Sequence, residues 1–76
     1  MLKLSERWVQ YLINQPETGM GYQIARVVLN DGSAFDRVVI MGDTIYEVDR
    51  SPDIPFTAAD IQDIKVRSGL EWDQHR

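Results

Sequence analysis

Apolar and β-branched residues concentrate in one long stretch of the chain, residues 22–48. Two turn sequences divide this stretch, Asn-Asp-Gly at residues 30–32 and Gly-Asp at residues 42–43. Runs of β-branched and aromatic residues bounded by such turns are typical of antiparallel strands. We therefore predict three consecutive strands joined by two hairpins, around which the rest of the chain is arranged.

The order Asn-Asp-Gly in the first turn favours a three-residue hairpin loop, in which Gly32 takes a left-handed conformation with positive φ. This loop length sets Arg26 opposite Asp36, a favourable pair of opposite charges. A two-residue loop would instead set Arg26 opposite Arg37, where like charges repel. Turn chemistry and charge therefore predict the same register for the first hairpin.

Strict alternation along this hairpin places apolar residues on both faces of the sheet. One face carries Ala25, Val27, Leu29, Phe35 and Val39. The other face carries a candidate interface made of Tyr22, Ile24, Val28, Val38 and Ile40. A sheet with one face in water has polar residues at every second position. We therefore expect both faces to be covered, one by the barrel itself and the other by a helix or a second subunit.

A helix is predicted over residues 5–14, with Ser5 as its cap and Pro16 beyond its end. Its apolar stripe consists of Trp8, Val9, Leu12 and Ile13, with Tyr11 at the margin. We predict that this stripe covers the outer face of the hairpin, the face of the candidate interface. The alternative is an exposed helix that binds a groove or a partner. Residues 15–21 read as a loop, and their glycines precede a strand instead of following one, unlike those of phosphate-binding loops.

The pattern of the third strand, residues 44–48, leaves two orientations open. We favour Tyr46 and Val48 facing inward, and the alternative turns Ile45 and Glu47 inward and leaves Tyr46 exposed. Residues 49–55 form an acidic loop without the ligand spacing of a calcium site. A short edge strand at residues 54–56 follows.

Residues 57–60, Thr-Ala-Ala-Asp, resemble an abbreviated capping box that opens a single helical turn. The closing strand is predicted at residues 63–67, where apolar and charged residues alternate. In the tail, residues 68–76, Leu70 and Trp72 are expected to pack against the barrel. The only histidine, His75, lies near the end of the chain, where it lacks the fixed neighbours of a base or a metal ligand.

This order of elements predicts a mainly β (α+β) fold in one domain, residues 1–76. The domain comprises an N-terminal helix and a five-stranded antiparallel small barrel over residues 22–67, with one helical turn before the last strand. The order resembles that of SH3-like barrels. Residues 27–39, VVLNDGSAFDRVV, also resemble the first two strands of Sm-like proteins, which carry a similar Leu-x-Asp/Asn-Gly turn and usually have glycine where Arg37 stands. The complete chain is similar to small single-domain bacterial proteins, and the Sm-like resemblance implies ring assembly and RNA binding.

Composition narrows the classes of function. Twelve acidic and eight basic residues give a net charge of −4, the opposite of the basic surface that nucleic-acid binding requires. The chain has no cysteine, which excludes disulfides and thiol chemistry and fits a reducing compartment. Its first residues do not resemble a signal peptide and no stretch is long enough to span a membrane, so we expect a cytoplasmic protein. A chain of this length buries only about 60% of its unfolded surface, which makes self-association a reasonable expectation.

No residue cluster has the spacing of a catalytic, metal or phosphate site, so we predict no enzyme, no cofactor and no small-molecule substrate. The favoured function is a non-enzymatic protein-interaction or assembly module whose partner is a protein, including a second copy of this chain. One alternative is a Sm-like nucleic-acid binder using the candidate ligand-binding residues Arg37, Tyr46, Lys65 and Arg67. The other is an enzyme with a pair of carboxylates brought together by the fold.

Overall fold

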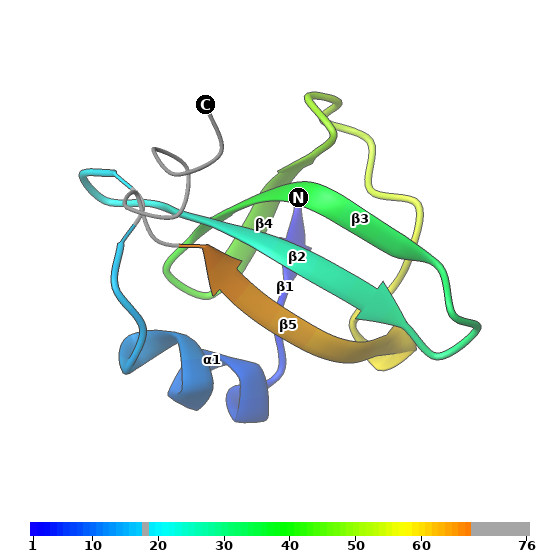
Figure 1. Cartoon of the computed structure of the whole chain (residues 1–76), viewed down its shortest axis with the longest axis horizontal. Coiled ribbons are helices and arrows are strands. Elements are labelled where there is room, and N and C mark those ends of the chain that lie inside the picture. Colours follow the sequence, from blue (N-terminus) through cyan, green and yellow to red (C-terminus); the bar gives the residue numbers. More distant parts are fainter. Residues whose placement is uncertain (18, 68–76) are drawn as a thin grey trace.

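The computed structural model describes residues 1–17 and 19–67, which form one antiparallel sheet and one helix (Figure 1). The elements are β1 (Leu2–Lys3), α1 (Glu6–Ile13), β2 (Gln23–Leu29), β3 (Ala34–Met41), β4 (Thr44–Val48), the 3-10 turn η1 (Ala58–Asp60) and β5 (Ile61–Arg67). The five strands lie in the order β1-β4-β3-β2-β5 and curl into a half-barrel. The predicted fold class, mainly β with a helical turn before the last strand, is confirmed.

One of the five strands is not where the sequence analysis placed it. Residues 54–56 form no strand, and the strand beside β4 is instead β1. Leu2 pairs with Ile45, and the backbone N–H of Leu4 donates to the Asp43 carbonyl at 2.7 Å. A strand of two residues is too short to show a periodic pattern, so β1 could not be predicted from the sequence.

The two hairpin turns have the predicted lengths. The backbone N–H of Leu29 donates to the Ser33 carbonyl at 2.8 Å, which closes the three-residue loop, and Gly32 has a φ of 92°. Arg26 Nη1 lies 3.1 Å from Asp36 Oδ1, so the predicted ion pair across the strands is confirmed. In the second turn Met41 pairs with Thr44 across residues 42–43.

A β-bulge in β3 reverses the faces predicted for its second half. Val27 pairs with Phe35 as expected, but Ala25 pairs with Val38, so that Arg26 alone faces residues 36–37. One extra residue on a strand shifts the alternation that follows it. The bulge therefore changes which side chains of β3 reach the core.

Val38 and Ile40 point into the core, and neither exposes any of its surface. The prediction that these two residues share a face with Tyr22, Ile24 and Val28 is therefore wrong. Val39, predicted on the inner face, instead pairs with Ile24 on the outer face. The outer face is consequently less apolar than expected.

A second bulge, at Tyr46 in β4, resolves the ambiguity of the third strand. Val39 pairs with Glu47 and Ile40 pairs with Ile45, which leaves Tyr46 as the extra residue. Ile45 and Val48 are both buried, whereas Tyr46 is exposed. The favoured prediction was thus right for Val48 and wrong for Tyr46.

Helix α1 covers the inner face of the sheet, not the outer face as predicted. Trp8 and Leu12 belong to the same buried cluster as Ala25, Val27 and Ile40. The helix binds this face because the bulge in β3 brings further apolar side chains to it. Only part of the predicted stripe is buried.

The ends of α1 differ slightly from the prediction. The helix begins at Glu6 and ends at Ile13, and the Ser5 side chain makes no capping hydrogen bond, although the backbone carbonyl of Ser5 accepts from the Val9 N–H at 3.1 Å. At the other end Ile13 leaves 68% of its surface exposed. The expected packing of Leu70 and Trp72 lies outside the described residues.

The predicted capping box is present at η1. Asp60 Oδ2 accepts hydrogen bonds from the backbone N–H and the hydroxyl of Thr57, at 2.9 and 3.1 Å. The Asn30 side chain donates to the Ala59 carbonyl at 3.0 Å, and the Asn30 backbone N–H donates to the Asp60 carbonyl at 2.8 Å. The tip of the first hairpin is therefore attached to η1, which fixes the start of β5.

Strand β4 ends in a two-residue turn that contains no glycine. Val48 and Ser51 exchange two backbone hydrogen bonds, at 2.9 and 3.0 Å, and between them Asp49 and Arg50 have positive φ values of 50° and 69°. A left-handed conformation costs a residue such as arginine about 1–2 kcal/mol. We expect Arg50→Gly to raise the free energy of unfolding in urea by about 1 kcal/mol. Arg50→Ala retains the Cβ and should give no gain, and equal stability of both variants would contradict this explanation.

Candidate functional site

A groove of about 700 Å³ opens on the described part of the chain. It lies between the second half of α1, the loop that follows it, the beginning of β2 and the turn between β3 and β4. Its lining residues are Val9, Leu12, Ile13, Gln15, Glu17, Gly21, Tyr22, Gln23, Ile40, Gly42 and Asp43. Protein pockets that bind ligands usually have volumes of about 300–1,000 Å³ and mostly apolar walls. In volume and in composition, this groove is within that class.

Helix α1 supplies one wall of the groove. Leu12 is buried against the sheet, whereas its neighbour Ile13 points away from the core and leaves most of its side chain in solvent. Val9 lies one turn earlier, is half-buried and lines the same groove. The helix therefore presents to the groove one aliphatic side chain, Ile13, that the domain's own packing leaves largely uncovered.

Gln23, the first residue of β2, joins the sheet to the C-terminal end of the helix. Its side-chain amide is buried and donates to the carbonyls of Leu12, Gln15 and Pro16, at 3.0, 3.3 and 3.4 Å. The last carbonyls of a helix have no partners within the helix. Gln23 thus satisfies the end of α1 and holds the helix and the sheet on either side of the groove.

Tyr22 forms another wall, and its position depends on Gly19. These two residues exchange backbone hydrogen bonds of 3.2 and 3.3 Å, and a Cβ on Gly19 would overlap the Tyr22 ring. The ring therefore lies directly over Gly19. Because 36% of its surface remains exposed, Tyr22 offers an aromatic side chain to any ligand in the groove.

Among the residues that the structure describes, two charged side chains line the groove, Glu17 and Asp43, and both are acidic. Asp43 Oδ2 is 3.9 Å from Lys3 Nζ, but both side chains are exposed and such a pair contributes little. The Asp43 carboxylate also accepts from the Thr44 hydroxyl at 2.9 Å. The groove therefore combines an apolar floor with a negatively charged rim.

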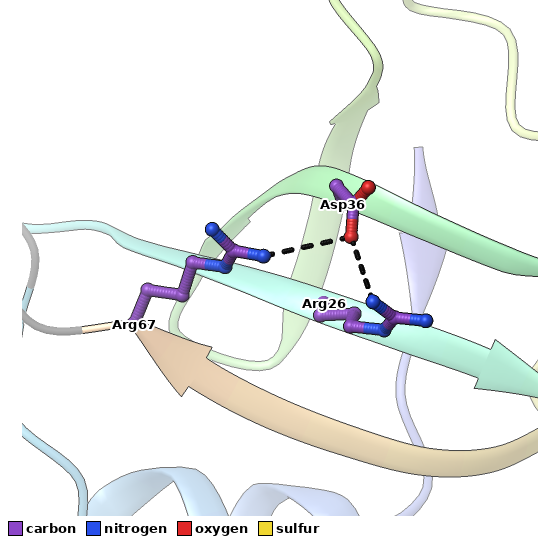
Figure 2. Close-up of polar contacts among 3 residues, drawn as sticks. All are labelled: Arg26, Asp36 and Arg67. Carbon is purple, nitrogen blue, oxygen red and sulfur yellow. Dashed lines mark hydrogen bonds and ion pairs between the residues drawn. The ribbon is translucent and has the colours of Figure 1, made fainter. Parts of the chain in front are cut away.

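The candidate ligand-binding residues are divided between two regions. Lys65 and Arg67 lie on β5, beside Arg26 of β2. Asp36 forms ion pairs with Arg26 at 3.1 Å and with Arg67 at 3.5 Å, so one carboxylate holds two guanidinium groups (Figure 2).

The other two candidate residues lie elsewhere. Tyr46 is on β4, which β3 and β2 separate from β5. Arg37 is in the bulge of β3, and its Nε is buried without a hydrogen-bond partner among the described residues. The structure therefore does not bring an aromatic ring of β4 to the basic residues of β5.

The candidate interface is divided as well. Val38 and Ile40 are core residues, with Ile40 also reaching the floor of the groove. Tyr22 lines the groove, Ile24 is buried on the outer face, and Val28 is half-buried there. The groove itself leaves no pattern in the sequence, because its walls come from segments that only the fold brings together. The available signal was weak: Ile13, an apolar residue, stands at the end of the helix stripe, next to the loop.

Within residues 1–17 and 19–67, no three His, Cys, Asp or Glu side chains are grouped so that they could hold a metal ion. None of the described helices is long and apolar enough to cross a membrane. Comparisons with protein-family models, with curated proteins and with solved structures found no match.

Proposed function

We propose that this protein is a non-enzymatic interaction module that binds a segment of a partner protein in the groove beside α1. The observation that carries the proposal is the exposed apolar lining, above all Ile13, together with the acidic character of both charged residues in the described lining, Glu17 and Asp43. This lining favours a peptide that inserts aliphatic or aromatic side chains and carries a lysine or arginine next to them.

Burial of Ile13 supplies the main apolar contribution. Complete burial of an aliphatic side chain is worth about 1.5–3 kcal/mol, and about two thirds of that remains to be gained at a side chain 68% exposed. Tyr22 adds an aromatic contact of the kind that is enriched at interaction hot spots. Glu17 and Asp43 then favour a cationic ligand over an anionic one.

We propose no catalytic activity and no cofactor for this protein. A relationship to SH3-like or Sm-like barrels and to bacterial proteins is part of the same proposal, supported by the curled five-stranded sheet and by η1 before β5. A cytoplasmic location is proposed from the absence of cysteine. Nucleic-acid binding is less well supported, because Asp36 already neutralises part of the charge of Arg26 and Arg67.

A selection from a random peptide library, followed by calorimetric titration of the enriched peptides, tests the proposal. We expect enrichment of apolar residues flanked by lysine or arginine. Ile13→Lys should weaken binding at least about tenfold, which corresponds to 1.4 kcal/mol. Met20→Lys is the matched control, because Met20 is 99% exposed, does not line the groove and undergoes the same change of charge.

The control should bind within about threefold of the parent, a difference of less than 1 kcal/mol. Failure to enrich any peptide, enrichment of acidic peptides, or equal binding by the Ile13→Lys variant would each refute the proposal. Thermal unfolding of both variants shows whether they remain folded.

A further inference from the structure

Within the part of the chain that the structure describes, strand β5 forms a long open edge of the sheet. It pairs with β2 on one side, and no other described strand pairs with it on the opposite side. Figure 1 shows β5 (orange) at the margin of the sheet. At the other margin β1 has only two residues, whereas β5 has seven. An edge strand of this length presents unpaired backbone donors and acceptors to which another strand can add.

From Asp63 on, the side chains of β5 alternate between the solvent and the core. Ile64 and Val66 are buried, and Asp63 and Lys65 are exposed. Neither Asp63 nor Lys65 forms an ion pair with any described residue of its own chain. Lys65 stands opposite Arg26 of β2, a like-charge pair that is unfavourable across strands. The free edge thus carries one acidic and one basic residue, two positions apart on the same face.

We infer that β5 pairs with β5 of a second copy, antiparallel and about a two-fold axis through Ile64. In this register Asp63 faces the partner's Lys65, and Lys65 faces the partner's Asp63. The axis makes the contact isologous, so both opposite-charge pairs form at once. Charges on an edge strand usually prevent pairing with another sheet. Here their order makes them complementary to a second copy.

The neighbouring registers are less favourable. Side chains that face each other across antiparallel strands lie on the same face, so an odd shift would set Asp63 against the apolar Ile64. An axis through Asp63 would set this residue against itself, and an axis through Lys65 would do the same for lysine. Like charges directly opposite are destabilising. Over residues 63–65, the register centred on Ile64 matches both faces and charges.

Pairing of this kind leaves the groove beside α1 open, because no residue of β5 lines it. The dimer would then offer two grooves. Two linked sites bind a partner with repeated segments more tightly than either site alone. The inference is independent of the proposed function, because dimerisation and peptide binding are measured separately and involve different residues.

Sedimentation velocity of the full chain over a range of concentrations, at low ionic strength, tests the inference. The parent should show a reversible monomer–dimer equilibrium. Asp63→Lys and Lys65→Asp each place like charges opposite each other and should weaken dimerisation at least about tenfold. The double variant with both substitutions exchanges the charges and should recover the parental dissociation constant within about threefold.

Mixing the two single variants provides a further test. One variant carries lysine at positions 63 and 65, and the other carries aspartate at both. The mixture should therefore form a heterodimer that is more stable than the homodimer of either variant. A parent that stays monomeric at millimolar concentration would overturn the inference. Single variants that dimerise as well as the parent would overturn it too, and so would a double variant that fails to recover while circular dichroism shows it folded.

Discussion

Replacement of Gly32 by valine should lower the free energy of unfolding by about 2–3 kcal/mol. Gly32 has a φ of 92°, in the left-handed region where a β-branched side chain is strained. A Cβ at this position would meet nothing within 4 Å, so the cost lies in the backbone conformation and not in a clash. The two hydrogen bonds that close the loop, Leu29 N–H to Ser33 carbonyl and Gly32 N–H to Leu29 carbonyl, depend on that conformation.

Gly32→Asn is the control for this substitution, because asparagine tolerates the left-handed region better than other residues. We expect this variant to lose less than about 1 kcal/mol. Urea denaturation of both variants measures the difference. A valine variant as stable as the parent would show that the loop accommodates a different turn.

The elements that the sequence predicted correctly are those determined by a few adjacent residues. The Asn-Asp-Gly loop, the Thr57–Asp60 capping box and the Arg26–Asp36 pair all follow from local chemistry and loop length. The Asp31 carboxylate adds to the same turn, since it accepts a hydrogen bond from the Ser33 backbone N–H, which lowers the pKa of Asp31. Such contacts do not depend on how the rest of the chain packs.

The faces of β3 and β4 could not be predicted in the same way. Each strand contains a bulge, at residues 36–37 and at Tyr46, and a bulge changes by one residue the alternation on which the assignment of faces rests. The chain offers no glycine at either position to mark it. Val38 and Ile40 lie on the inner face, and α1 packs against that face with them. A wrong assignment of faces in one strand therefore led to a wrong position for the helix.

The candidate site was even harder to predict from the sequence than the faces of the strands. Its walls come from α1, the loop after it, β2 and the turn between β3 and β4. Ile13 and Tyr22 looked like ordinary members of a stripe and a strand, and only the fold shows that both remain exposed. Glu17 and Asp43 likewise belong to a loop and a turn. Their common sign becomes meaningful only when they border the same groove.

The side chain whose importance was least visible in the sequence is Gln23, and its loss should be among the most damaging substitutions. Gln23→Leu removes the donor that serves the carbonyls of Leu12, Gln15 and Pro16. A buried polar group left without a partner costs about 1–3 kcal/mol. Water in the adjacent groove can reach part of this site, so we expect a loss of about 2 kcal/mol in urea denaturation.

Gln23→Glu separates the missing hydrogen bonds from simple loss of packing, because it retains the shape of the side chain. At neutral pH its carboxylate would face carbonyl oxygens in a buried position, at a cost of about 3 kcal/mol or more. Burial beside these oxygens raises the pKa of the glutamate in the folded state above its unfolded value of about 4.3. The destabilisation is therefore complete above the folded pKa and disappears as the pH falls to the unfolded value, where the protonated acid donates as the amide did. If Gln23→Leu and Gln23→Glu instead show the same dependence of stability on pH, the amide of Gln23 does not hold the end of α1.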